Sequence, residues 1–192
     1  MNDILNRKNV LTALAGAVVS LSLSLACMST AQAALKDGAA APDFTTQASL
    51  GGQVSTYSLH EALKQGPVVL YFYPAAFTTG CTIEAHEFAD AVDQYKALGA
   101  TVIGVSHDNI ETLNKFSVSE CRSKFAVAAD PDRHIMTAYY ATLPLTKYAN
   151  RVSYVIAPDG KVIYSFTSLS PDLHVHNTLQ ALQQWVSQHP KQ

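Results

Sequence analysis

A single cysteine, Cys81, stands where a short loop rich in Pro, Thr and Gly gives way to a helical pattern. Apolar residues after it recur at the spacing of one helix face, which predicts a helix over 81–98. The first turn of a helix carries unpaired N–H groups and the positive end of the dipole, so it favours an anion. Because the thiolate is the nucleophilic form of cysteine, the pattern predicts a reactive thiol at Cys81.

The alternative for Cys81 is an inert core thiol, since unpaired cysteine is among the most buried residue types. Thr78 and Gly80, just before it, favour the tip of a loop instead. That loop leaves a continuous apolar strand of the buried type, expected over 67–73. We therefore expect Cys81 at the loop tip rather than in the core.

Four residues of this segment form a longer motif. Pro74, Thr78 and Cys81 fit Pro-x-x-x-Thr-x-x-Cys, and Glu84 follows as an acidic residue. In these residues the chain resembles the peroxiredoxins of the AhpC/TSA superfamily, most closely the bacterioferritin-comigratory (PrxQ-like) subgroup. The resemblance runs over nearly the whole chain after residue 38. It implies a thiol peroxidase that reduces hydrogen peroxide and small organic hydroperoxides without a metal or another cofactor.

The resemblance also assigns roles within the motif. Cys81 would be the nucleophile that peroxide oxidises to a sulfenic acid. Thr78 would pass a hydrogen bond to the bound oxygen, and Pro74 would shield the thiolate from water. Without the resemblance, Thr78 is explained by an ordinary Ser/Thr turn, and Pro74 by the end of a strand.

An arginine at the start of the penultimate hairpin belongs to the resembled site, and Arg151 stands there. Alternation along 151–156 puts Arg151 on the face of Val155, and an arginine facing a core needs an anionic partner. Glu84 is expected to supply it through a bidentate pair. Taken without the resemblance, Arg151 is better explained as a solvated strand end, and Glu84 as a favourable charge in a first helical turn.

Cysteine content bears on the second half of the reaction. Cys27 lies in the segment 1–33, which is expected to be a cleaved signal peptide, so the mature chain keeps Cys81 and Cys121. In an exported protein two cysteines most simply form one disulfide. Most of the resembled subgroup has its resolving cysteine five residues after the nucleophile, where this chain has His86. The resemblance therefore leaves Cys121 as the resolving cysteine, and a one-Cys mechanism stays open. A thioredoxin-like or other thiol would be the reductant.

Cys81 and Cys121 are expected to begin too far apart for a bond, since a disulfide needs Cα atoms within about 7 Å. Both segments should then unwind locally in each cycle. Two other functions stay open. A thioredoxin-like disulfide oxidoreductase would use Cys-x-x-Cys, which this chain lacks. A non-catalytic exported module would keep a permanent Cys81–Cys121 bridge, worth about 4 kcal/mol for a loop of this length.

The start of the chain is typical of an export signal. A positively charged beginning, an apolar or small-residue stretch over 10–26 and a small-residue cleavage site predict a cleaved signal peptide over 1–33. A single domain over 34–192 and a periplasmic location follow. A retained membrane anchor and a lipoprotein anchor at Cys27 are the alternatives.

Composition excludes several classes of partner. Removal of 1–33 leaves a net charge of −3 and no basic run, so nucleic acid is not expected as a partner. Among seven histidines, His174 and His176 are close neighbours, but no third ligand lies near them in sequence. Since a metal site needs three or four ligands, no metal is expected. His86 and His107 are expected near the site only as solvated or core residues. The resemblance implies a monomer or weak dimer.

The elements that must position these residues alternate along the chain. Strands and helices in turn, then a hairpin and a last helix, predict an α/β fold with a central mixed β-sheet flanked by helices on both faces. This is a thioredoxin-like fold, which the resemblance also implies. Expected strands cover a hairpin at 44–56, then 67–73, 100–106, 125–129 and a hairpin at 151–166; expected helices cover 58–64, 81–98, 109–119, 132–140 and 172–188.

Overall fold

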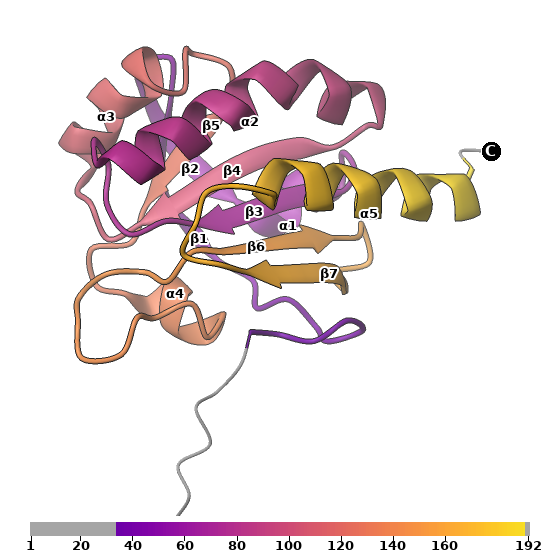
Figure 1. Cartoon of the computed structure of the whole chain (residues 1–192). Coiled ribbons are helices and arrows are strands. Elements are labelled where there is room, and N and C mark those ends of the chain that lie inside the picture. Colours follow the sequence, from indigo (N-terminus) through magenta and orange to yellow (C-terminus); the bar gives the residue numbers. More distant parts are fainter. Residues whose placement is uncertain (1–33, 191–192) are drawn as a thin grey trace, which may run out of the picture. The chain divides into compact units, whose positions relative to one another are not determined.

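The computed structural model describes residues 34–190, which form a seven-stranded mixed sheet with helices on both faces (Figure 1). The expected signal peptide over 1–33 and Cys27 lie outside the described residues. Within 34–190, no helix is both long and apolar enough to cross a membrane. The predicted thioredoxin-like arrangement of sheet and helices is confirmed.

Strand order in the sheet is β2-β1-β5-β4-β3-β6-β7. The three central strands β5, β4 and β3 run parallel, and the pairs toward both edges are antiparallel. The strands are β1 (Thr45–Leu50), β2 (Gln53–Ser58), β3 (Val68–Phe72), β4 (Thr101–Ser106), β5 (Ala126–Ala129), β6 (Val152–Ile156) and β7 (Val162–Thr167). The helices are α1 (Leu59–Leu63), α2 (Thr79–Ala97), α3 (Ile110–Ser119), α4 (His134–Ala138) and α5 (His174–Gln188).

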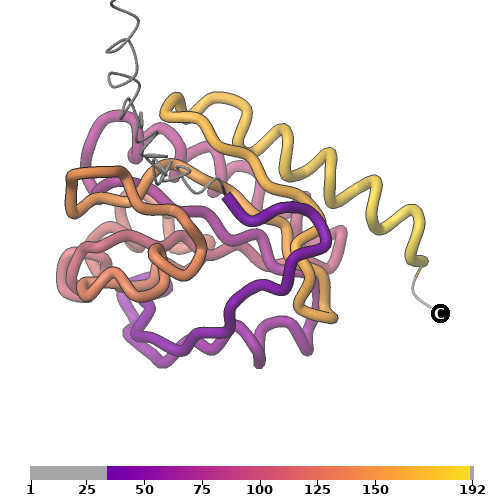
Figure 2. Tube along the Cα trace, turned by 90° about the horizontal axis from the view of Figure 1, so that it is seen from below, coloured from indigo at the N-terminus to yellow at the C-terminus, as the bar shows by residue number. Residues whose placement is uncertain are grey.

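Strand β3 shows why the sheet needs cover on both sides. All five of its residues are buried, because successive side chains point to opposite faces and each face is covered. Val69 and Tyr71 pack with α2, α3 and α5, whereas Leu70 and Phe72 pack with α1 and α4. The far end of α5 extends beyond the sheet (Figure 2).

Several boundaries differ from the predicted ones because single residues adopt left-handed backbone angles. The predicted helix over 132–140 shortens to α4, which lies between Arg133 and Tyr140, both with positive φ. Helix α5 begins only after Leu173, at φ 71°. Apolar periodicity carries no information on such residues, because their conformation interrupts a helix without changing its pattern.

Gly104 of β4 lies opposite Tyr71 in the parallel register. A Cβ at this position would lie 2.7 Å from Cζ and 2.8 Å from the hydroxyl oxygen of Tyr71. The Tyr71 ring is stacked on Phe88 with centroids 4.3 Å apart, so it has little freedom to retreat. The strand therefore needs a residue without a side chain here.

We predict that Gly104→Ala lowers the free energy of unfolding by about 1–3 kcal/mol, through overpacking of a rigid ring. Chemical denaturation of the reduced protein measures it. In a Tyr71→Leu background, where the ring is gone, the same substitution should cost less. An equal cost in both backgrounds would mean that the ring is not the cause.

Candidate active site

Helix α2 begins at Thr79, with Thr78 in the extended conformation as its N-cap, so Cys81 is the third residue of the first turn. Cys81 is 1% exposed, and the expected loop-tip position is therefore wrong. The helix starts two residues earlier than predicted, which turns the Cys81 side chain toward the sheet. The thiol thus combines the helix N-terminus with a buried environment.

The Arg151 side chain reaches Cys81 from the start of β6. Its Nη2 lies 3.5 Å from Cys81 Sγ, and its Nε donates to the Leu169 carbonyl at 3.0 Å. A Cβ on Gly80 would lie 3.2 Å from the same Nη2, so the glycine leaves room for this approach. Arg151 is 4% exposed, so the expected direction toward the core is observed.

Glu84 supplies the counter-charge one turn after Cys81. Its Oε2 accepts from Arg151 Nη1, and the carboxylate is fully buried. The contact uses one carboxylate oxygen only, because the other two guanidinium nitrogens of Arg151 face Leu169 and Cys81. The expected bidentate pair is therefore not formed. Burial raises the pKa of Glu84 and the charge of Arg151 opposes that rise. Burial lowers the pKa of Arg151, but Glu84 and Cys81 outweigh it and leave that pKa above its ordinary value.

His174 supports this pair from α5, a role that sequence reasoning missed. Its Nε2 donates to the Ser168 carbonyl at 3.1 Å, so its Nδ1 accepts from the Ser153 hydroxyl at 2.8 Å. The neutral ring also places Nδ1 3.9 Å from Glu84 Oε1, which has no hydrogen-bond partner among the described residues. Burial and, to a smaller extent, Arg151 lower the pKa of His174 to about 4.

A metal at this histidine is not supported by its contacts. Both ring nitrogens of His174 are engaged by serine oxygens, as the distances above establish. Within residues 34–190, no three His, Cys, Asp or Glu side chains gather closely enough to hold an ion. His174 is a structural element of the Arg151 environment.

Thr78 and Pro74 lie in the loop between β3 and α2. The Thr78 hydroxyl donates to the Ala75 carbonyl at 3.0 Å, which is the local turn bond of the simpler explanation; its oxygen can still accept. Pro74 is half-buried, and its carbonyl lies 3.2 Å from His107 Nδ1. Asp108 fixes the same loop, accepting from the Ala76 N–H at 2.7 Å. No sequence pattern pointed to Asp108, whose role depends on two loops that meet only in the fold.

Cys121 lies just past the end of α3 and is also fully buried. Burial, with a contribution from Glu120, raises the pKa of its thiol far above the ordinary value. Both Cys81 and Cys121 are free thiols. Arg122 and Ser123, which follow, have φ of 50° and 56°, in the left-handed region that costs energy for residues with a side chain.

A hydrogen bond and an ion pair fasten the residues on either side of Cys121 to α2. His86 Nε2 lies 2.9 Å from Glu120 Oε2, and Arg122 Nη1 contacts Asp90 Oδ1. His86 occupies the position where the resembled subgroup most often has its resolving cysteine. We call these two contacts the α2 clasps. They join α2 to the segment that contains Cys121.

Comparison with known proteins identifies this arrangement. The family model described as AhpC/TSA family matches residues 38–165. The chain belongs to the AhpC/TSA family. The prediction of a peroxiredoxin of the bacterioferritin-comigratory, PrxQ-like type is confirmed by the relatives that follow.

Relatives of this family member are named as peroxiredoxins. Peroxiredoxin Q, chloroplastic, of Oryza sativa subsp. japonica is 33% identical over 153 residues, 76% of this chain and 66% of its own length. A peroxiredoxin bcp of Helicobacter pylori is 30% identical over 154 residues, 77% of this chain and 98% of its own length. The crystal structure of peroxidoxin BcpB from Mycobacterium tuberculosis matches with a TM-score of 0.71 and 30% identity, covering 78% of this chain and 97% of that one.

The lowered pKa of His174 predicts a pH dependence of stability. The pKa of His174 is about 4 in the folded domain and 6.5 ordinarily, so protonation of His174 favours the unfolded chain. Above about pH 6.5 the histidine is neutral in both states, and the domain keeps its full stability. That stability falls as the pH drops toward 4, by about 3 kcal/mol in total. We predict that wild type loses this amount relative to His174→Gln between pH 6.5 and 4. Denaturant unfolding at several pH values measures it, and parallel curves would contradict it.

Proposed function

We propose that the chain is a thiol-specific peroxidase that reduces hydrogen peroxide and small organic hydroperoxides at Cys81. The observation that carries this proposal is the buried Cys81 sulfur in the first turn of α2, 3.5 Å from the Arg151 guanidinium. A helix N-terminus and a cation both favour the thiolate. The family relatives named as peroxiredoxins support the same reaction.

The reaction follows from these groups. The Cys81 thiolate attacks one peroxide oxygen, an S–O bond forms, and the O–O bond breaks. The departing oxygen takes both electrons of that bond and a proton, and leaves as water or an alcohol. Arg151 holds the oxygens that carry the developing charge, and Thr78 donates to them once its bond to Ala75 opens. Glu84 fixes Arg151, and Pro74 limits water around the thiolate.

We propose Cys121 as the resolving cysteine. Its sulfur attacks the Cys81 sulfenic acid, an S–S bond forms, and the hydroxyl leaves as water. A thiol reductant, thioredoxin-like or of another kind, then returns both thiols. Since each cysteine is buried and free, the start of α2 and the segment around Cys121 have to open first. The left-handed Arg122 and Ser123 and the α2 clasps mark where that opening would occur.

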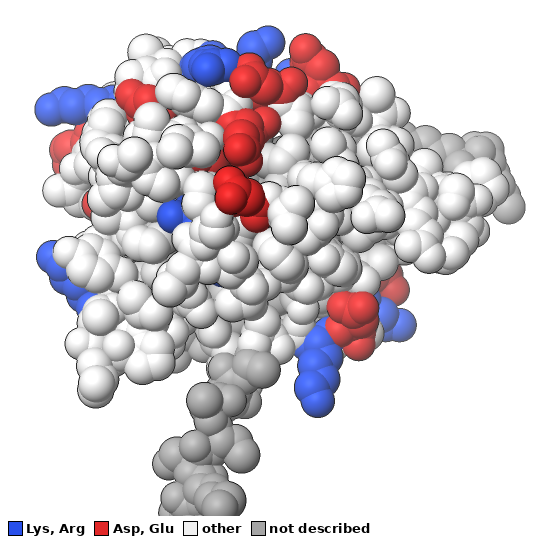
Figure 3. All heavy atoms as spheres, viewed as in Figure 1, with Lys and Arg blue, Asp and Glu red and all other residues white. Residues whose placement is uncertain are grey.

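The setting of the enzyme is also a proposal. We assign 1–33 to a cleaved signal peptide and the mature domain to the periplasm, on the charge and apolar pattern of the sequence. The face in Figure 3 carries acidic and basic side chains in small groups, without a broad basic area. A monomer or weak dimer is the proposed assembly.

The peroxidase proposal predicts the fate of both thiols. One equivalent of hydrogen peroxide should remove both thiols from reduced mature protein and lower its mass by about two units, because two thiol hydrogens are lost. Thiol titration and intact mass measure this. Cys121→Ser should instead gain one oxygen at Cys81, and Cys81→Ser should keep its remaining thiol. Two thiols that survive for minutes in wild type would overturn the proposal.

Release of the α2 clasps predicts faster disulfide formation. In the double variant His86→Ala, Asp90→Ala, Glu120 and Arg122 lose their partners, and the Cys121 segment should open more often. Pairs this exposed contribute up to about 1 kcal/mol each, so we predict disulfide formation roughly 2–5-fold faster at an unchanged rate of sulfenic acid formation. Rapid quench with mass spectrometry separates the steps.

Asp93→Ala is the matched control for the clasp variant. Asp93 is exposed on the same helix and makes no ion pair among the described residues, so it tests the effect of alanine on α2 alone. It should leave both rates unchanged. If the double variant matches this control, opening of the segment does not limit disulfide formation.

A further inference from the structure

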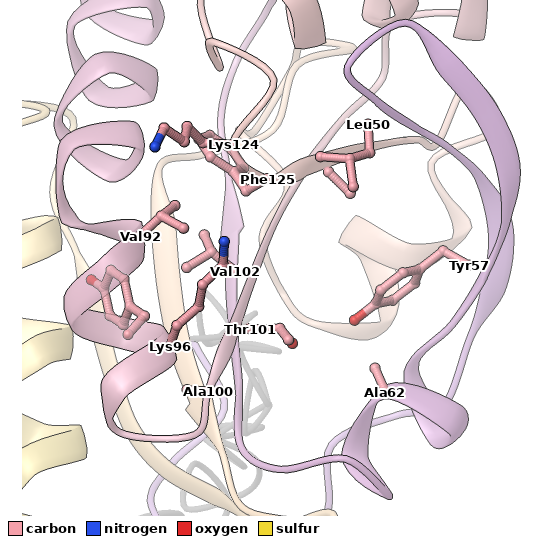
Figure 4. A pocket seen from close by; sticks show the side chains of 12 residues that line it. Leu50, Tyr57, Ala62, Val92, Lys96, Ala100, Thr101, Val102, Lys124 and Phe125 are labelled. Atoms are coloured by element: carbon pink, nitrogen blue, oxygen red, sulfur yellow. The ribbon is translucent and has the colours of Figure 1, made fainter.

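A cavity of about 300 Å³ opens between the C-terminal half of α2, the beginnings of β4 and β5, and the β1–β2 hairpin (Figure 4). Val92 and Lys96 of α2 line it, eleven and fifteen residues after Cys81. At about 1.5 Å per residue these positions lie about 16 Å or more along the helix from the thiol. None of the proposed active-site residues lines the cavity. It is a second, separate site of small-ligand size.

Most of the cavity wall is apolar, but one hydrogen-bonding group is left over. Leu50, Val92, Val102 and Phe125 form the apolar wall. The hydroxyl of Tyr57 is buried and has no hydrogen-bond partner among the described residues. Figure 4 shows it pointing from the hairpin side into the cavity. Burial raises the pKa of Tyr57, so the group stays a neutral donor, and a buried donor without a partner is unfavourable.

Positive charge lies on the opposite side. Lys96 and Lys124 line the cavity from the α2 side, and within the described chain neither has a carboxylate within ion-pair distance. Figure 4 shows the Lys96 amine extending toward the middle of the opening. The site therefore offers cations at one end, an apolar middle and an unpaired phenol at the other end.

We propose that this cavity binds a medium-chain carboxylate that carries a hydroxyl or carbonyl oxygen near its far end. The carboxylate meets Lys96 and Lys124, the alkyl chain covers Val102 and Phe125, and the terminal oxygen accepts from Tyr57. The terminal oxygen meets the one buried polar group of the wall that has no partner in the described chain, and the carboxylate meets two exposed lysines. An uncharged alkane leaves the lysines and the phenol without partners, and a simple fatty carboxylate still leaves the phenol.

Occupancy would also reach the proposed resolving step, and this part rests on the proposed function. Lys124 donates its N–H to the Cys121 carbonyl at 2.9 Å, and the Phe125 ring packs edge-on against Tyr71 and Phe88. A ligand that holds Lys124 and Phe125 in place also holds the segment that must open to bring Cys121 to Cys81. Bound ligand therefore slows disulfide formation and leaves the attack on peroxide unchanged.

Calorimetry on reduced mature protein tests the site without reference to catalysis. Three probes of equal chain length separate its features: ω-hydroxydecanoate, decanoate and decanol, all below their aggregation limits. We expect ω-hydroxydecanoate to bind most tightly, and Tyr57→Phe to reduce it to the affinity of decanoate. Lys96→Gln with Lys124→Gln should weaken both carboxylates about tenfold and leave decanol unchanged. Lys161→Gln, a control on the β6–β7 turn, should change nothing.

Two results would overturn the binding site: no heat with any probe, or affinities that neither Tyr57→Phe nor the double lysine variant alters. Val102→Phe, which fills the cavity from a buried strand position, should abolish binding and provides a second check. Rapid quench with and without ω-hydroxydecanoate then tests the coupling. We expect the ligand to slow disulfide formation several-fold in wild type and to leave it unchanged in Val102→Phe, which cannot bind. Binding without slowing refutes the coupling, whereas a protein inert to peroxide refutes the proposed function and leaves the binding result standing.

Discussion

The buried charge of Arg151 is the constraint on which the rest of the site depends. A guanidinium cannot remain in a core without partners, because desolvation costs more than packing returns. Its partners come from two separate elements: Cys81 and Glu84 on α2, and Leu169 in the loop after β7. Each contact fixes the position of one element against the others. The geometry around the thiol is thus set by the need to satisfy one cation.

This constraint extends outward to residues that never touch the thiol. Leu169 follows Ser168, whose carbonyl accepts from His174, so α5 holds the loop that holds Arg151. The same histidine lies beside the unpaired oxygen of Glu84, and its neutral state avoids a second positive charge beside Arg151. The C-terminal helix therefore contributes to a site whose reacting atom lies far earlier in the chain.

The sequence predicts those features of the fold and the site that depend on residues close together in the chain. The apolar run of β3 and the helical period after Cys81 predicted the strand, the helix and the first-turn position of the thiol, and the hairpin expected at 44–56 is the β1–β2 hairpin. Those features arise from neighbours in sequence. The Pro-x-x-x-Thr-x-x-Cys motif pointed to the family because its spacing is a local property of one loop.

What the sequence could not supply was contact between distant segments. The burial of Cys81 follows from a helix start at Thr79, two residues before the periodic pattern begins. Glu84 makes a single contact with Arg151 because the other two guanidinium nitrogens contact Leu169 and Cys81. His174 attracted attention as a possible metal ligand, whereas its role comes from Ser153 and the loop around Ser168. No periodicity encodes such meetings.

Burial serves the two halves of the proposed cycle in opposite ways. Around Cys81, burial excludes water from the attack on peroxide, and the Arg151 guanidinium lies 3.5 Å from the sulfur. Around Cys121, the same dryness raises the thiol pKa and keeps the second sulfur unreactive until its segment opens. In the same core cluster as both cysteines lie Tyr71 and Tyr73, whose hydroxyls are buried without hydrogen-bond partners among the described residues. An unpaired buried hydroxyl costs energy in the closed state, and contact with water on opening would recover that cost. The molecule thus leaves two unpaired hydroxyls close to the cysteines that the second step must bring together, while Arg151, bonded to Glu84, Leu169 and Cys81, keeps the first step rigid.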